Sequence, residues 1–145
     1  MKSVLFVCLG NICRSPACEG IARNMFNGKA TFKSAGTDAE VGSAPDYRSI
    51  AVCKRHGISI SRHHARQFDD SDWYKFDLIV ALDQDVFSTL DNWKPSDPKA
   101  KLVLFDEKNG GVDDPWYGNE AGFDTMYNQI EKAMPDFLKE HNIVA

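Results

Sequence analysis

The chain has 145 residues, of which 43% are hydrophobic and 11% aromatic, so it is long enough and apolar enough to form one domain with a substantial core. Its formal net charge of −4 argues against nucleic acid or an anionic membrane as the main partner. The first apolar run, residues 4–9, is too short to span a membrane and lacks the cleavage site of a signal peptide. We therefore expect a cytoplasmic protein.

Hydrophobic patterns predict four buried strands that alternate with helices. The strands are expected at residues 4–7, 31–35, 76–82 and 101–105. The helices are expected from 16 to about 26, from 46 to about 55, from 85 to 93 and from about 122 toward the C-terminus. Strands that alternate with helices predict a single α/β domain over residues 1–145, a Rossmann-like three-layer αβα sandwich around a four-stranded parallel sheet.

Local signals define how these elements begin and end. Ser15 suits the N-cap of the first helix and Pro16 its first helical position, while Asn27 and Gly28 are expected to end it. Residues 36–45 and 62–72 are expected to be loops. Pro135 is expected to kink or break the last helix, because proline lacks the N–H that the helix needs.

The stretch from Cys8 to Ser15 follows the first strand and leads into the first helix. The N–H groups at a helix N-terminus have no internal partner and carry a partial positive charge, so such a loop can bind a phosphate group. Gly10 and Asn11 tolerate the positive φ that a loop with inward-facing amides requires. The phosphate-binding residues predicted here are Leu9, Gly10, Asn11, Ile12, Cys13, Arg14 and Ser15.

Cys8 and Arg14 add chemistry to this loop. A cysteine at a helix N-terminus beside a guanidinium is readily ionised, so we expect Cys8 to be a nucleophilic thiolate at neutral pH. Arg14 presents a planar fork that matches two phosphoryl oxygens. This Cys-x5-Arg-Ser loop resembles the signature of cysteine-dependent phosphatases, and the string from Val7 to Pro16 resembles the low-molecular-weight protein tyrosine phosphatases in particular. The resemblance extends from Val4 to about Phe137.

The resemblance implies a second catalytic stretch at Asp114-Pro115-Trp116-Tyr117. A leaving phenol needs a proton from a positioned acid, and Asp114 takes that role by its match to the family's acid loop. Trp116 and Tyr117, together with Leu9 and Glu40, are expected to line the substrate pocket. Some relatives have an aromatic ring on the pocket wall at the position of Ala39 and Glu40, which this chain lacks, so substrate preference follows less directly than reaction type.

The resemblance also implies supporting roles. Ser15 is expected to hydrogen-bond the thiolate, Asn11 to hold the loop's shape, and His63 and Asp83 to lie behind the loop. Such an enzyme would hydrolyse phosphotyrosine in proteins, and small aryl phosphates, through a phosphocysteine intermediate. Its expected partners are a tyrosine-phosphorylated protein and inorganic phosphate or another oxyanion.

The four cysteines are Cys8, Cys13, Cys18 and Cys53. An intracellular chain of this size is not expected to have a disulfide framework, and no Cys-x2-Cys pair or clustered His spacing supports zinc, so the cysteines favour thiol chemistry. We therefore expect no metal and no cofactor. The resemblance implies that Cys8 and Cys13 can form a reversible disulfide on oxidation, which would make the enzyme redox-regulated. Simple packing of Cys13 beneath the loop is an equally good interpretation of its everyday role.

Three alternatives remain open. Arsenate reductases of similar fold use a later pair of cysteines, and this chain has none after Cys53. Arginine phosphatases of similar fold have a threonine where this chain has Ile12, and they lack the two aromatic residues after Asp-Pro. A phosphopeptide-binding module would need the loop and Arg14 but neither Cys8 nor Asp114.

Overall fold

A computed structural model describes residues 1–145 and has a four-stranded parallel sheet at its centre. The strands lie in the order β2-β1-β3-β4, with all three neighbouring pairs parallel. Their bounds are β1 Ser3–Cys8, β2 Thr31–Gly36, β3 Leu78–Ala81 and β4 Lys101–Leu104. The predicted parallel sheet is therefore confirmed, with strands slightly shorter than the hydrophobic runs of residues 76–82 and 101–105.

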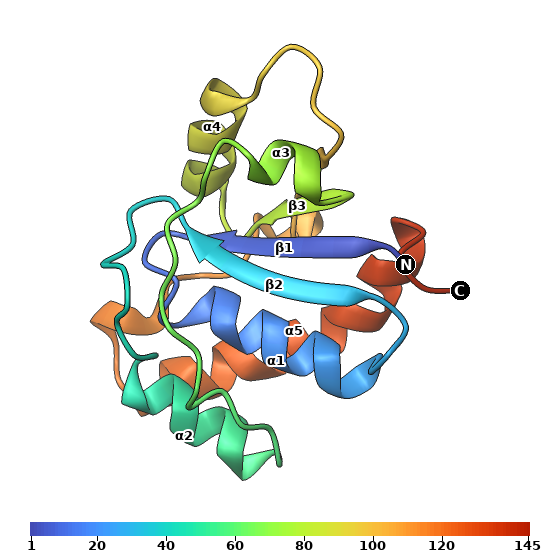
Figure 1. Cartoon of the computed structure of the whole chain (residues 1–145). Helices are drawn as coiled ribbons and strands as arrows, with labels where there is room; N and C mark the ends of the chain where they lie inside the picture. Colours follow the sequence, from blue (N-terminus) through green and yellow to red (C-terminus); the bar gives the residue numbers. More distant parts are fainter.

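Helices cover both faces of this sheet (Figure 1). Contacts join α1 (Arg14–Met25) to β1 and β2, and α5 (Glu120–Glu140) packs on α1 and on α2 (Tyr47–Arg55). The short α3 (Asp72–Lys75) and α4 (Gln84–Trp93) cover the opposite face. Two single-turn 3-10 helices, η1 (Glu107–Asn109) and η2 (Pro115–Tyr117), lie in the segment between β4 and α5. This is the predicted three-layer αβα arrangement.

The alternation of side chains along β1 explains the two cores. Val4 and Phe6 pack with α1 and α5, whereas Leu5 and Val7 pack with α3 and α4. All four side chains are fully buried, because successive residues of a strand point to opposite faces and both faces are covered. The continuous apolar run of residues 4–7 is the sequence signal of such a central strand.

Two local predictions about α1 were wrong, and so was a break in α5 at Pro135. The helix α1 begins at Arg14, so its N-cap is Cys13 rather than Ser15, and Pro16 is its third residue. The Ser15 hydroxyl contacts Cys8 and Asn11 instead of capping the helix. Pro135 does not break α5, which runs unbroken from Glu120 to Glu140.

The remaining differences are small. The segment predicted as a loop to residue 72 ends in α3, which was not expected, and α5 begins two residues before Gly122. Among the helices, none combines the length and apolar composition that crossing a bilayer requires. Cys8 is the last residue of β1 and so lies at the carboxyl ends of the parallel strands, which is where parallel α/β folds bind their ligands.

Candidate active site

The loop from Cys8 to Arg14 joins β1 to α1 and presents free backbone donors. The N–H groups of Leu9, Gly10, Ile12, Cys13, Arg14 and Ser15 donate to no group of the protein. Asn11 takes the left-handed conformation, with φ 57°, that the sequence predicted for this position. A loop of unpaired N–H groups that leads into a twelve-residue helix is a site for an anion.

A neighbouring glycine lets the loop pack closely on β2. A Cβ atom at Gly36 would lie 2.6 Å from the carbonyl oxygen of Leu9 and 3.0 Å from the amide nitrogen of Asn11. The amides of Thr37 and Asp38 donate to the carbonyls of Cys8 and Leu9 at 3.0 and 2.8 Å. The start of the loop is therefore held by backbone contacts that only glycine at position 36 permits.

The Cys8 sulfur lies inside the loop, and the residue is only 2% exposed. Its Sγ is 3.0 Å from the Ser15 hydroxyl oxygen, and the Asn11 amide donates to it at 3.3 Å. A hydroxyl and an amide that donate to sulfur stabilise its anionic form. The structure thus gives Ser15 the contact with Cys8 that the family resemblance implied.

Arg14 is buried at the base of the loop with a defined set of partners. Its Nη1 donates to Asp83 Oδ2 at 2.6 Å and to the carbonyl of Val112 at 2.9 Å. Burial by itself would lower the pKa of Arg14, but the negative charges of Cys8, Asp83 and Asp114 outweigh burial and raise that pKa. The guanidinium is therefore a permanent positive charge.

The other side of the Arg14 fork is free. Its Nε is buried without a hydrogen-bond partner, and its Nη2 has only Asp114 Oδ2 nearby, at 3.6 Å. A buried donor without a partner is costly unless a ligand satisfies it. Nε and Nη2 form the edge of the guanidinium that can bind two oxygens of one phosphoryl group.

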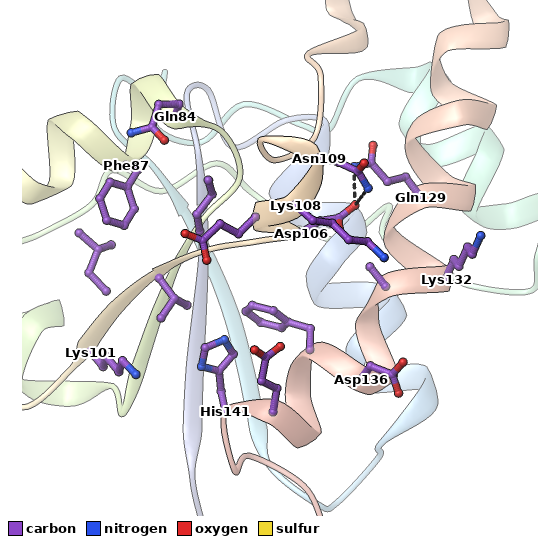
Figure 2. Close-up of a pocket in the computed structure, with 17 residues that line it drawn as sticks. Gln84, Phe87, Lys101, Asp106, Lys108, Asn109, Gln129, Lys132, Asp136 and His141 are labelled. Atoms are coloured by element: carbon purple, nitrogen blue, oxygen red, sulfur yellow. Dashed lines mark hydrogen bonds between the residues drawn. The ribbon is translucent and has the colours of Figure 1, made fainter.

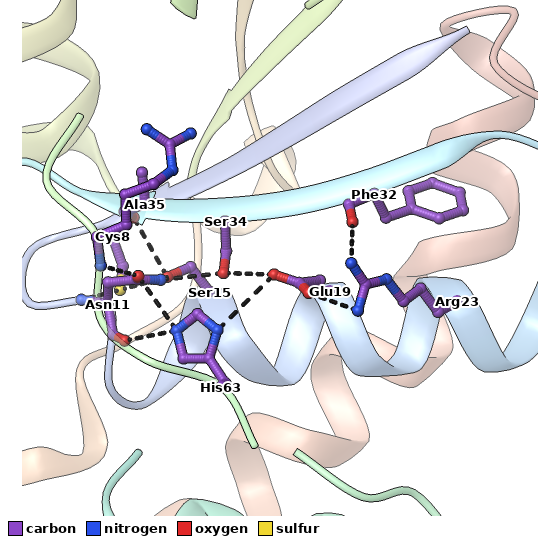
Figure 3. Close-up of polar contacts among 10 residues, drawn as sticks. Cys8, Asn11, Ser15, Glu19, Arg23, Phe32, Ser34, Ala35 and His63 are labelled. Carbon is purple, nitrogen blue, oxygen red and sulfur yellow. Dashed lines mark hydrogen bonds and ion pairs between the residues drawn. The ribbon is translucent and has the colours of Figure 1, made fainter. Parts of the chain in front are cut away.

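A chain of side-chain hydrogen bonds runs from the loop along α1, from Asn11 to Glu19 (Figure 3). The side-chain nitrogen of Asn11, Nδ2, donates to Ser15 Oγ at 2.8 Å and to Ser34 Oγ at 3.0 Å. The Ser34 hydroxyl in turn donates to Glu19 Oε1 at 2.7 Å. The Asn11 side-chain oxygen accepts from the Arg66 amide at 2.8 Å. Asn11 is completely buried, so its amide group is matched on both sides and holds the loop in one conformation.

His63 and Glu19 continue this network. The His63 Nε2 lies 3.1 and 3.2 Å from the side-chain and backbone oxygens of Asn11, and its Nδ1 lies 4.0 Å from Glu19. Burial lowers the pKa of His63, while Glu19 and the Asn11 carbonyl oppose that shift. Arg23 pairs with Glu19 at 2.8 Å. Sequence reasoning identified His63 and Asp83 but missed Glu19 and Ser34, although Glu19 lies one helical turn after Ser15.

The second predicted stretch lies beside this loop. Asp83 forms an isolated bridge with Gly111, and the residues just after this bridge, Val112 and Asp114, lie beside Arg14. The Asp114 side chain is 31% exposed, and its Oδ1 accepts from the amide of Trp116 at 3.1 Å. Trp116 and Tyr117 are exposed and contact each other edge to face, with their ring centroids 4.9 Å apart.

The remaining predicted pocket residues differ in how closely they join the site. Leu9 is half exposed at the rim of the loop. Glu40 is exposed in the segment after β2, and its side chain makes no hydrogen bond. The structure therefore brings together Cys8, Arg14 and Asp114, and leaves Glu40 without a contact that ties it to them.

The other three thiols differ from Cys8 in their surroundings. Burial raises the pKa of Cys13 and Cys18, and it raises the pKa of Cys53 to about 12. The charges of Asp46 and Cys8 add to the effect on Cys13. These three thiols therefore remain protonated at neutral pH.

A large groove lies elsewhere, along the free edge of β4 between α4 and α5 (Figure 2). Gln84 and Phe87 border it on one side, and Lys132 and Asp136 border it on the other. None of the predicted site residues lines this groove. No group of three or more His, Cys, Asp or Glu side chains in the chain could hold a metal ion.

Comparisons with known proteins agree with this geometry. A phosphatase of Schizosaccharomyces pombe, described as a low molecular weight phosphotyrosine protein phosphatase, is 40% identical over 94% of each chain. The crystal structure of a protein tyrosine phosphatase from Entamoeba histolytica with Hepes in the active site superposes with a TM-score of 0.91 at 32% identity, covering 98% of this chain and 97% of that one.

A third similar structure is that of a Drosophila arginine phosphatase, with a TM-score of 0.86 at 29% identity over 97% of this chain and 98% of that one. Residues 3–143 match the family described as low molecular weight phosphotyrosine protein phosphatase. The chain therefore belongs to the low molecular weight phosphotyrosine protein phosphatase family.

Proposed function

We propose that this phosphatase hydrolyses phosphotyrosine in proteins through a phosphocysteine formed on Cys8. The observation that carries the assignment is the arrangement around one sulfur atom. Free loop amides and the unpartnered Nε of Arg14 can all donate to a phosphoryl group, while Cys8 Sγ is held by Ser15 and Asn11. Donors arranged in this way stabilise the charge that develops on the phosphoryl oxygens in the transition state.

In the first step, the Cys8 thiolate attacks phosphorus and the bond to the phenolic oxygen breaks. Arg14 and the loop amides bind the three non-bridging oxygens. Asp114, whose Oδ2 lies 3.6 Å from Arg14 Nη2, enters this step as the neutral carboxylic acid, gives its proton to the departing phenolic oxygen and is left as the carboxylate. The products of this step are the phenol and a phosphocysteine.

In the second step, Asp114 takes a proton from a water molecule that attacks the phosphocysteine. The phosphorus–sulfur bond breaks, inorganic phosphate leaves, and Cys8 returns as a thiolate. The Ser15 hydroxyl, 3.0 Å from the sulfur, stabilises that thiolate as it departs. Inorganic phosphate is thus both product and a ligand of the loop.

The exposed aromatic pair supports a preference for an aryl leaving group. Trp116 and Tyr117 follow the acid directly and offer flat apolar surfaces where a phenol ring can lie. Leu9 adds an apolar surface at the rim, and we include Glu40 as a polar residue on the side where other family members place a ring. Free thiols throughout the chain support a reducing compartment, so we place the enzyme in the cytoplasm.

The experiment compares initial rates of phosphate release from phosphotyrosine, phosphoserine and phosphoarginine peptides, with Cys8→Ser as the control. Rapid release from phosphotyrosine alone, absent in Cys8→Ser, is the expected result. Faster release from phosphoarginine would assign the activity of the Drosophila relative instead. Binding of the phosphotyrosine peptide without release would mean that the chain is a phosphopeptide reader.

A further inference from the structure

The end of the segment that carries the acid, residues 116–118, is held by the side chain of Arg48 on α2. Its Nη2 donates to the carbonyl of Trp116 at 3.2 Å, and its Nη1 donates to the carbonyl of Gly118 at 3.1 Å. These two carbonyls lie on either side of Tyr117, at the end of the turn that begins at Asp114. A planar fork with fixed donor directions can hold two carbonyls in one geometry.

Arg48 is itself held rigidly. Its Nε and Nη2 donate to the two oxygens of Asp46 at 3.0 and 2.8 Å, and its carbon CZ lies 4.5 Å from the centre of the Phe123 ring. Its side chain is only 17% exposed, and Phe123 is buried. A guanidinium that is paired, stacked and mostly shielded from water loses little further entropy when it binds the two carbonyls.

The same end of α2 is attached to the phosphate-binding loop. The Asp46 amide donates to the carbonyl of Ile12 at 2.9 Å, and the Ser49 hydroxyl donates to the carbonyl of Cys13 at 3.0 Å. Ser49 is completely buried. The start of α2 therefore contacts the phosphate loop through residues 46 and 49 and contacts the acid segment through Arg48.

We infer that Arg48 is a positioning residue for the general acid: by clamping the carbonyls of residues 116 and 118, it sets where Asp114 stands relative to the phosphoryl group on Cys8. This inference rests on the proposed function. Arg48 does not touch the reacting atoms, so its effect passes through Asp114. Losing it should weaken proton transfer to the leaving group while phosphate binding by the loop remains.

Substrates with different leaving groups distinguish a loss of proton transfer from a loss of phosphate binding. We compare kcat/KM for phenyl phosphate, whose leaving group needs a proton, with kcat/KM for p-nitrophenyl phosphate, whose leaving group departs more easily as an anion. In Arg48→Ala we expect kcat/KM for phenyl phosphate to fall about tenfold, part of the roughly 100-fold or larger contribution of a general acid, and that for p-nitrophenyl phosphate to fall at most about twofold. The inhibition constant of inorganic phosphate should stay within about twofold of wild type. Arg48→Lys, which keeps the charge but not the fork, should fall between wild type and Arg48→Ala.

Arg55→Ala is the matched control. Arg55 also lies on α2 and also reaches α5, where it pairs with Asp124 at 2.7 Å, but both side chains are about half exposed and neither contacts the acid segment. Its kinetics should equal those of the wild type with both substrates. Melting temperatures of all variants show whether each is folded at the assay temperature. If Arg48→Ala is not folded there, the comparison is made with Arg48→Lys.

The decisive measurement is a double-mutant cycle with Asp114→Asn. If Arg48 acts through Asp114, Arg48→Ala should cause no further loss for phenyl phosphate in the Asp114→Asn background. Losses that multiply, or equal losses with both substrates, would overturn the inference while leaving the proposed function intact. A wild-type protein that hydrolyses neither substrate, or an Asp114→Asn variant that loses both equally, would overturn the proposed mechanism and this inference with it.

Discussion

Gly36→Ala tests how closely β2 must approach the phosphate-binding loop. The added Cβ would lie 2.6 Å from the Leu9 carbonyl oxygen, a separation that must widen by about 0.8 Å to reach ordinary contact at 3.4 Å. Gly36 itself cannot move away easily. Its amide donates to the Arg66 carbonyl, and its carbonyl accepts from the Phe68 amide, both at 2.8 Å. We therefore expect the loop to move rather than the strand.

The expected magnitudes follow from that displacement. Overpacking of this kind costs about 1–3 kcal/mol, which corresponds to a fall in Tm of about 5 °C for a domain of this size. A misplacement of about 1 Å in a catalytic group costs about 100-fold, so kcat/KM for an aryl phosphate should fall between about 10- and 100-fold. The inhibition constant of inorganic phosphate should rise in parallel, because the same amides bind phosphate and the transition state.

Gly28→Ala separates loss of stability from loss of loop geometry. Gly28 has φ 77° and no atom within 4 Å of an added Cβ, so alanine there is strained without a collision. This variant should lose about 1 kcal/mol and keep full activity. If Gly36→Ala lowers Tm but leaves kcat/KM and phosphate inhibition within twofold of wild type, the strain is absorbed elsewhere and our reasoning about the loop is wrong.

Three further predictions concern side chains around the loop. Asp83→Ala should lower kcat/KM about tenfold and weaken phosphate inhibition, since Arg14 loses the carboxylate that orients its fork; unchanged phosphate inhibition would contradict this. Hydrogen bonds from Arg48 lower the pKa of Asp46 below its unfolded value of about 3.9. The Asp46–Arg48 pair therefore stabilises the fold fully above that pH, and this stabilisation is lost as the pH falls through the pKa of Asp46 in the folded protein. The Tm gap between wild type and Asp46→Asn should thus be widest near neutral pH and narrow in acid, and a gap that stays constant down to pH ~3 would refute the assignment. After mild peroxide treatment, dithiothreitol should restore wild type but not Cys13→Ser, with mass spectrometry locating the disulfide; equal recovery of both would exclude a protective role for Cys13.

Short-range patterns were enough to predict the layers of the fold and the loop after the first strand, whereas the stretch from Asp114 to Tyr117 was predicted from the family resemblance. The apolar run of residues 4–7 must be a central strand, and the loop from Cys8 to Arg14 must follow it, because both depend on hydrophobic period and local turn chemistry. The same local reasoning failed at Pro135. There the buried face of α5, with Met134 and Leu138 in the core, outweighs the roughly 3 kcal/mol that an internal proline costs.

Contacts between distant segments were decided only by the tertiary structure. Arg14 meets Asp83 and the carbonyl of Val112 because β3 and the bridge after it lie beside β1, and nothing in a stretch of local sequence sets that neighbour relation. Ser15 was predicted to cap a helix, yet the folded chain places its hydroxyl against Cys8 Sγ. The attachment of Arg48 to residues nearly seventy positions away is of the same kind. Local sequence therefore determines which groups are available for the chemistry. Packing of the sheet and its helices determines where those groups lie, because side chains far apart in the chain meet only when both faces of the sheet are covered.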